Sequence, residues 1–117
     1  MRLKSSIFVS AILRREQGEG AFGAVLRKGA EDAGAIFVVH RTGGDTANVY
    51  APAPQMFAVE SGSGERLFEE RLKEAGPQEV DEFLGRQIGF DPDCWIVEID
   101  KRSELVSIDI VDPDAGM

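Results

Sequence analysis

Apolar residues recur at three- and four-residue spacing from residue 7 onward, which is the period of an amphipathic helix. Ser5 or Ser6 is suited to cap the start of this helix, and Gly18 is suited to end it. The same stretch also alternates as a strand would, but the residues at its ends favour the helix. The face that we expect the helix to bury comprises Phe8, Ala11, Ile12 and Arg15.

The clearest helical pattern spans residues 77–88. Proline suits the first turn, which needs no backbone N–H, and acidic residues near the start complement the positive end of the helix dipole. Gly89 is placed to end the helix, with Phe90 folding back against it. The apolar stripe of this helix comprises Val80, Phe83, Leu84 and Ile88.

Elsewhere the apolar period falls to two, which is typical of strands. Residues 21–27 alternate and residues 35–41 form a second run rich in strand-forming residues. The loop between them begins and ends with glycine, so the two runs predict an antiparallel hairpin. Residues 65–73 fit either a helix or a strand and are left open. Further strands are predicted over residues 47–51, 56–59, 95–99 and 106–110.

This order of elements predicts one α+β domain over residues 1–117, with a frayed tail at 112–117. Strands in hairpins or a meander would form an antiparallel sheet, and two helices would pack with it. A chain of 117 residues has room for one such domain with a core of its own.

The net charge of −8 is unevenly distributed, with +2 over residues 1–50 and −10 over residues 51–117. An acidic chain is repelled by phosphate backbones, so nucleic-acid binding is disfavoured. No apolar run is long enough to span a membrane, and the short apolar stretch near the start lacks the cleavage site of a secretory signal. A single cysteine suits a reducing compartment, and we therefore expect a cytoplasmic protein.

Carboxylates gather where the second helix ends. Asp91 and Asp93 flank a rigid proline and Glu98 follows, so these acids could offer oxygen ligands to a divalent cation. The spacing does not match a calcium loop, and Asp-Pro-Asp is also ordinary turn chemistry, in which the aspartates bond nearby backbone N–H groups or pair with Arg86 or Arg102. The turn interpretation is favoured, and no metal site or cofactor is predicted.

The loop at residues 29–34 is a second candidate. Its backbone N–H groups, together with Arg27 and Lys28 before it, could receive an anion. A hairpin loop in which Asp32 satisfies its own backbone is the favoured interpretation.

His40 and Cys94 are the only histidine and the only cysteine. His40 shares a strand face with Ile36 and Val38, which favours a partly buried structural imidazole over a catalytic or metal-binding one. Cys94 beside Trp95 is expected to be a small buried apolar group, rather than a nucleophile paired with His40.

Four stretches together resemble the bacterial family called domain of unknown function 1491. The stretches are Arg2-Leu3-Lys4-Ser5; Val9-Ser10-Ala11 with Leu13-Arg14-Arg15; Lys28-Gly29 with Asp32-Ala33-Gly34-Ala35-Ile36; and Phe90-Asp91-Pro92-Asp93 with Trp95-Ile96-Val97-Glu98-Ile99. The last is the most specific, and the resemblance is weakest over residues 55–76. Cys94 stands where the family pattern has an apolar residue. The family has no assigned activity, so the resemblance implies a single domain and no particular function.

The leading functional hypothesis is a small interaction or regulatory module that binds a protein partner or a second copy of itself. The alternative is a small ligand-binding domain or enzyme built around Asp91 and Asp93, and no catalytic residue is assigned. The candidate binding residues are Arg27, Asp32, Arg86, Asp91, Asp93, Trp95 and Glu98.

Overall fold

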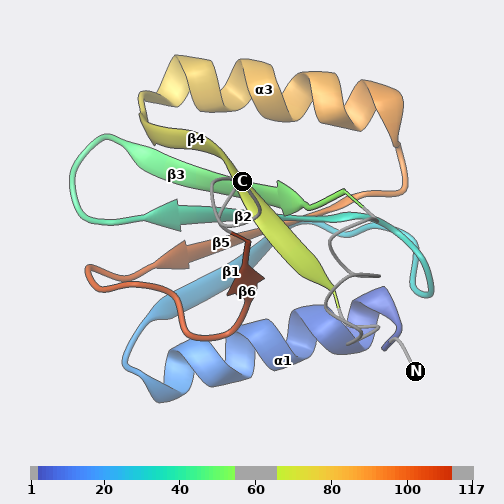
Figure 1. Ribbon diagram of the computed structural model, residues 1–117, viewed down its shortest axis with the longest axis horizontal. Helices are drawn as coiled ribbons and strands as arrows, with labels where there is room; N and C mark the ends of the chain where they lie inside the picture. Colours follow the sequence, from blue (N-terminus) through green and yellow to red (C-terminus); the bar gives the residue numbers. More distant parts are fainter. Residues whose placement is uncertain (1–2, 55–65, 112–117) are drawn as a thin grey trace.

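A computed structural model describes residues 3–54 and 66–111, so the strand predicted at 56–59 and the tail at 112–117 lie outside the described residues. The elements in chain order are α1 (Ser5–Gly18), β1 (Phe22–Arg27), β2 (Ile36–Arg41), β3 (Ala47–Pro52), β4 (Leu67–Ala75), α3 (Pro77–Phe90), β5 (Trp95–Asp100) and β6 (Asp109–Ile110). The prediction of an α+β domain with two long helices is confirmed within this part of the chain (Figure 1).

The strands form one mixed sheet in the order β1-β5-β2-β3-β4-β6. The predicted hairpin of residues 21–41 is wrong, because β5 lies between β1 and β2, antiparallel to β1 and parallel to β2. The physical reason lies in β5 itself. Trp95, Ile96, Val97 and Ile99 bury side chains on both faces of the sheet, which requires a central position with a strand on each side. The sheet is therefore mixed rather than purely antiparallel.

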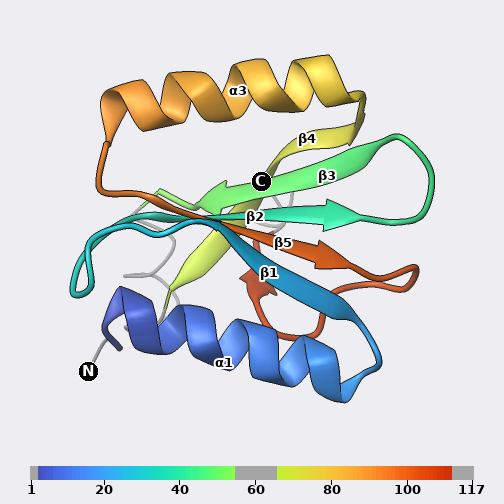
Figure 2. The same ribbon diagram turned by 180° about the vertical axis from the view of Figure 1, so that it is seen from behind.

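One helix lies on each side of the sheet (Figures 1 and 2). Helix α1 contacts β1 and β5, whereas α3 contacts β3 and β4 on the opposite face. The core beneath α1 includes Ile36, Val38 and Val97, and the core beneath α3 includes Phe37 and Val39. Adjacent side chains of β2 therefore pack into cores on opposite faces of the sheet. Each helix thus packs on one face of the sheet.

The buried face of α1 differs from the predicted one. Ser5, Val9, Ile12 and Glu16 are buried, whereas the expected members Ala11 and Arg15 are exposed. The predicted face did not include Ser5 and Glu16, which are polar but find buried partners. Neither Ser5 nor Ser6 caps the helix: Lys4 is the N-cap residue, and Ser5 Oγ instead donates to the Gly34 carbonyl oxygen at 2.6 Å.

Helix α3 follows its prediction more closely. Val80, Phe83 and Leu84 are buried, with Ile88 packed against them. The helix continues past Gly89 to Phe90, however, and Phe90 is 82% exposed rather than folded back.

The structure also settles the segment left open at residues 65–73 and changes the predicted last strand. The segment left open at residues 65–73 is the strand β4, which pairs antiparallel with β3. The predicted last strand shortens to Asp109–Ile110, and residues 101–108 instead form an irregular segment across the α1 side of the sheet. In the described ranges, no helix is long and apolar enough to cross a membrane.

Candidate functional site

The predicted corner around Asp91 is a packed structural joint. Arg27 Nη2 donates to the Pro92 carbonyl oxygen at 2.7 Å, and the Trp95 indole donates to the Ala30 carbonyl oxygen at 2.7 Å. The Asp91 carboxylate accepts the backbone N–H of Asp93 at 3.0 Å, which is the turn chemistry favoured from the sequence. These bonds fasten the loop after β1 to the turn before β5.

The backbones at this joint approach so closely that two positions exclude a side chain. A Cβ at Gly29 would lie 2.6 Å from the carbonyl carbon of Cys94 and would overlap the Asp93 carbonyl oxygen. A Cβ at Gly34 would overlap that same oxygen. The glycines that bound the loop at residues 29–34 therefore permit this close packing.

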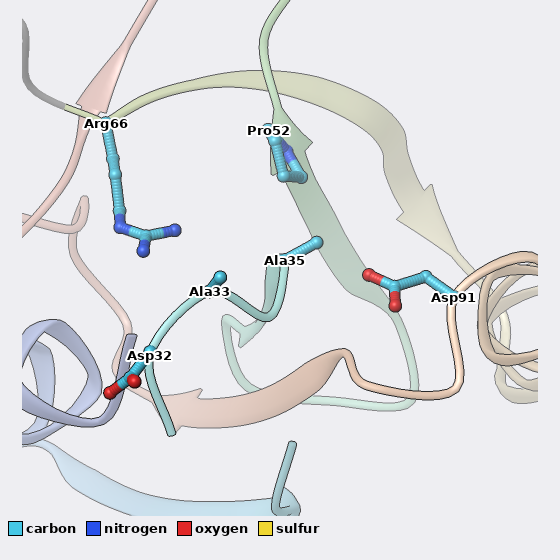
Figure 3. Close-up of a pocket in the computed structure, with 6 residues that line it drawn as sticks. All are labelled: Asp32, Ala33, Ala35, Pro52, Arg66 and Asp91. Atoms are coloured by element: carbon cyan, nitrogen blue, oxygen red, sulfur yellow. The ribbon is translucent and has the colours of Figure 1, made fainter. Parts of the chain in front are cut away.

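A shallow pocket of about 340 Å³ lies beside the joint and contains two predicted residues (Figure 3). The Asp91 carboxylate is directed toward the pocket, whereas that of Asp32 is directed away and lies 3.5 Å from Lys4 Nζ. The cation on its wall, Arg66, already donates to Ser5 Oγ at 2.8 Å and lies over the Phe8 ring. The polar groups of this pocket are engaged in holding the fold.

The remaining predicted residues lie elsewhere. Arg86 is exposed on α3, and Glu98 pairs with Arg41 at 2.8 Å near the other end of β5. The structure therefore brings Arg27, Asp91 and Trp95 together as a joint and leaves Arg86 and Glu98 apart. Over residues 3–54 and 66–111, no group of three or more His, Cys, Asp or Glu residues is arranged to hold a metal ion.

Cys94 and His40 do not form a nucleophilic pair. Cys94 is fully buried in the core beneath α3, whereas His40 continues the face of Ile36 and Val38 toward the other core. Burial, followed by the charge of Asp91, raises the pKa of the Cys94 thiol and keeps it protonated. The expectation that Cys94 is buried among apolar residues is confirmed.

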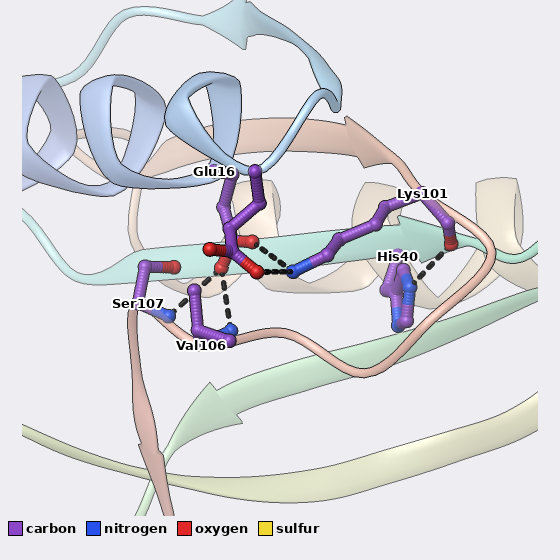
Figure 4. A network of polar contacts seen from close by, with 6 residues as sticks. Glu16, His40, Lys101, Val106 and Ser107 are labelled. Carbon is purple, nitrogen blue, oxygen red and sulfur yellow. Dashed lines mark hydrogen bonds and ion pairs between the residues drawn. The ribbon is translucent and has the colours of Figure 1, made fainter.

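A buried polar network, which the sequence did not predict, ties α1 to the segment after β5 (Figure 4). The Glu16 carboxylate is fully buried and accepts hydrogen bonds from Lys101 Nζ at 2.9 Å and from the backbone N–H groups of Val106 and Ser107 at 2.9 and 2.8 Å. We call Glu16, Lys101, Val106 and Ser107 the Glu16 network. It anchors both ends of residues 102–105.

The protonation of Glu16 follows from competing effects. Burial is the largest influence and would raise the pKa of the carboxyl group, but hydrogen bonds from Ser107, Lys101 and Val106 together outweigh it. The pKa of Glu16 is lowered from its ordinary value of 4.5. The carboxylate is therefore charged at neutral pH, opposite the largely buried side chain of Lys101.

His40 adjoins the Glu16 network and is 3% exposed. Its Nε2 lies 2.8 Å from the carbonyl oxygen of Lys101 (Figure 4). Because a carbonyl oxygen only accepts, Nε2 carries a hydrogen, and in the neutral ring Nδ1 keeps a lone pair. Nδ1 is buried and has no hydrogen-bond partner among the described residues.

The imidazole forms part of the wall of a pocket of about 410 Å³, which we call the His40 pocket. Its buried members are His40 on β2 and Tyr50 on β3, with Asn48 partly buried between them. Exposed side chains from β4 and from residues 102–105 surround them. These charged residues are Glu70, Lys73, Arg102 and Glu104.

Hydrogen bonds orient the polar groups of this pocket before any ligand enters. The Asn48 side-chain oxygen accepts the backbone N–H of Glu74 at 2.8 Å, which leaves its amide N–H groups for the phenol oxygen of Tyr50. Glu70 lies opposite Tyr50 in the sheet register. Burial, followed by the charge of Glu70, raises the pKa of Tyr50, so the phenol stays protonated.

Comparison with protein families and solved structures places this geometry in context. The family model described as "Protein of unknown function (DUF1491)" matches residues 3–108. This chain belongs to the DUF1491 family. The resemblance inferred from the sequence is thereby confirmed, and the family's function is unknown.

Solved DUF1491-like structures share the fold. Protein Atu0922 from A. tumefaciens is 46% identical, with a TM-score of 0.84 over 96% of this chain and 97% of that chain. A crystal structure of a DUF1491 family protein from Caulobacter crescentus CB15 is 28% identical, with a TM-score of 0.76 over 96% of this chain and 100% of that chain. The comparison with curated proteins found no match.

For this DUF1491 member, sequence reasoning missed the Glu16 network and undervalued His40. One signal was present: Val9, Ile12 and Glu16 follow the same helical spacing, so Glu16 continues a buried stripe. Its partner Lys101 lies 85 residues away, and nothing in the sequence pairs them. His40 was expected to have a satisfied ring, whereas only one of its nitrogens has a partner among the described residues.

Proposed function

We propose that this protein is a cytoplasmic, bacterial ligand-binding module whose site is the His40 pocket. This keeps the ligand-binding hypothesis drawn from the sequence but moves its centre from the Asp91 joint to the opposite end of β2. A binding role is favoured over catalysis because the polar groups of the pocket are suited to recognise a molecule, while no activated nucleophile faces it among the described residues. The known relatives from A. tumefaciens and Caulobacter crescentus support a bacterial origin.

The observation that carries the proposal is the buried Nδ1 of His40, which has no partner within the described ranges. A buried polar atom without a partner destabilises the fold by about 1–3 kcal/mol, so such atoms call for an explanation. Nδ1 is covered by its neighbours in this structure, so a ligand group can donate a hydrogen bond to it only after those side chains move aside. The nearby Tyr50 and Asn48 are already oriented, which reduces the entropy lost when the ligand binds.

A thermal-shift screen with His40→Gln as the matched variant tests this function. Glutamine can still donate to the Lys101 carbonyl oxygen but lacks the Nδ1 acceptor. We expect at least one class among amino acids, hydroxy acids, sugars, nucleosides and phosphorylated metabolites to raise the melting temperature of the wild type. A ligand present at one hundred times its Kd stabilises a protein by about 2.7 kcal/mol.

The His40→Gln variant should fold with a similar melting temperature and lose that response. A panel that leaves the wild type unmoved would contradict the proposed function. So would a ligand that stabilises the His40→Gln variant as strongly as the wild type.

A second candidate function is self-association through strand β1, which continues the interaction hypothesis. Phe22 is 80% exposed, Leu26 53% and Val25 41%, on a strand whose outer edge pairs with nothing in the described part of the chain. Exposed apolar edge strands are templates for pairing with another chain. A second copy in antiparallel register would bring Lys28 of each copy toward Asp100 of the other, since Asp100 lies beside Phe22 at the opposite end of β1.

Analytical ultracentrifugation tests this second candidate. We expect a concentration-dependent dimer for the wild type and a monomer for Leu26→Lys, because the lysine interrupts the apolar edge. Ile7→Lys is the matched control, since Ile7 is 51% exposed on α1 away from that edge. A wild-type monomer at every concentration, or loss of the dimer in Ile7→Lys alone, would overturn the β1 interface.

A further inference from the structure

Residues 102–105 cover the His40 pocket in the described part of the chain. The side chains of His40 and Tyr50 lie on the α1 side of the sheet. Helix α1 packs there on β1 and β5, whereas residues 102–105 line the pocket over β2 and β3. Figure 4 shows the chain passing beside the His40 ring on its way from Lys101 to Val106. We call residues 102–105 the strap.

The strap itself is held by packing alone. Over residues 3–54 and 66–111, neither its backbone nor its side chains form a hydrogen bond or an ion pair with the rest of the protein. Arg102, Ser103 and Glu104 are exposed, and Leu105 is the member that packs against the core beneath α1. A segment with so few buried contacts and no backbone hydrogen bonds opens at a low cost in free energy.

The two ends of the strap, by contrast, are fixed to the fold. Before it, the Lys101 backbone N–H donates to the Arg41 carbonyl oxygen at 3.0 Å, and the Lys101 carbonyl oxygen accepts from His40 Nε2. After it, the Val106 backbone N–H donates to Glu16 at 2.9 Å, and Lys101 Nζ reaches that same carboxylate. The middle of the strap can therefore move while its ends stay in place.

Two opposing effects act on the closed strap. Closing it buries part of the Leu105 side chain, which favours the closed position. It also leaves His40 Nδ1 buried without a partner among the described residues, which disfavours that position. Opening would let water donate to Nδ1, and this gain offsets the lost packing of Leu105. The free energies of the two positions are therefore close.

Resting on the proposed ligand-binding function, we propose that the strap is a lid, which opens between its fixed ends to admit the ligand and closes over it. Packing of Leu105 holds the lid closed. A bound ligand that donates to Nδ1 supplies the missing hydrogen bond, so it stabilises the closed position. The bond between Nε2 and the Lys101 carbonyl oxygen keeps the imidazole in place while the lid moves.

Acylation of the imidazole by diethyl pyrocarbonate tests the lid on the intact protein without a ligand. The reagent reacts with an accessible ring nitrogen that has a lone pair, and His40 is the only histidine. Mass spectrometry of the peptide that contains His40 gives the rate. Leu105→Ala should raise this rate about tenfold, because the shorter side chain loses the apolar contact that holds the lid closed.

Val80→Ala is the matched control, because it shortens a buried side chain in the core on the other face of the sheet. It should lower the melting temperature and leave the acylation rate within about twofold of the wild type, since the lid is untouched. Hydrogen exchange gives a second readout. The amides of Val106 and Ser107, which donate to Glu16, should keep their protection in Leu105→Ala because the ends of the strap stay fixed.

The outcomes separate the lid from the ligand-binding function. Suppose that a ligand stabilises the wild type but not His40→Gln, and that Leu105→Ala is acylated no faster than the wild type: the function then stands and the lid is wrong. Loss of protection at Val106 and Ser107 in Leu105→Ala would also overturn the lid, because the whole segment would then unfold. If no compound of the thermal-shift screen stabilises the wild type, the function fails and the lid fails with it.

Discussion

Replacing Glu16 with leucine is expected to lower the free energy of unfolding by about 3–5 kcal/mol, because one partner of a buried ion pair is removed and the other stays buried. Lys101 is 8% exposed and loses its carboxylate, and the backbone N–H groups of Val106 and Ser107 lose their common acceptor. Urea denaturation followed by circular dichroism measures the change.

Two milder variants make the Glu16 prediction specific. Glu16→Gln retains an oxygen acceptor and should fall between the wild type and Glu16→Leu. Glu19 also approaches Lys101, at 3.9 Å, but its side chain is 53% exposed, so Glu19→Gln should lower stability by less than about 1 kcal/mol. Equal losses in Glu19→Gln and Glu16→Leu would show that the buried network does not hold the segment.

The same carboxylate gives stability a defined pH dependence. The pKa of Glu16 is lower in the folded protein than its ordinary value of 4.5, so the folded state favours the charged form. Its contribution is complete above pH 4.5 and is lost as the pH falls through the lowered folded value. The difference in unfolding free energy between the wild type and Glu16→Gln should therefore shrink in acid, and a constant difference between pH 7 and pH 3 would contradict this assignment.

The Glu16 network also bears on the proposed site, because residues 102–105 lie between its two anchoring points. Lys101 precedes them, Val106 follows them, and both are bonded to Glu16. Arg102 and Glu104 can hold fixed positions beside His40 only while this segment is anchored. Loss of Glu16 should therefore weaken ligand binding as well as folding.

Gly29→Ala is the other substitution with a large expected effect, a loss of about 3 kcal/mol or more in unfolding free energy. Its Cβ would overlap the Asp93 carbonyl oxygen and lie 2.6–2.7 Å from the Cys94 carbonyl group. These atoms are backbone, so no side-chain rotation relieves the overlap, and the loop must separate from the turn before β5. Thermal and urea denaturation measure the loss.

Gly85→Ala is the matched control for this steric argument. Gly85 lies on the exposed face of α3 with nothing within 4 Å of where its Cβ would be, so alanine should stabilise the helix by about 0.5–1 kcal/mol. The two substitutions make the same chemical change and should act in opposite directions. A Gly29→Ala protein as stable as the wild type would refute the close packing of the joint.

The sequence predicted what depends on local periodicity. The stripe of Val80, Phe83 and Leu84, the strand-forming run of β2 and the turn chemistry of Asp91 all act over a few residues, and each appears in the structure. The order of the strands could not be predicted in this way. The position of β5 between β1 and β2 depends on burying both of its faces, and hairpin rules consider only neighbours along the chain.

The site eluded prediction for a related reason. The sequence cues drew attention to the charged residues near Asp91, which the fold uses as caps and anchors. The His40 pocket combines β2, β3 and β4 with the segment after β5, so its parts are scattered along the chain. The sequence correctly predicted which face of β2 carries His40. It could not predict the partner of a ring nitrogen, because Lys101 lies 61 residues away.

The central claim is that the Nδ1 of His40 is an unoccupied acceptor in a ligand site, and nitrogen NMR of the imidazole tests it most directly. His40 is the only histidine, so a ¹⁵N-labelled sample gives one pair of ring-nitrogen signals without assignment by mutation. In the free protein, the account predicts a hydrogen on Nε2 and a bare Nδ1. The best ligand of the screen should then move the Nδ1 signal in a saturable way and leave Nε2 nearly unchanged. A hydrogen on Nδ1 in the free protein, or an Nδ1 signal that no ligand moves, would contradict the account.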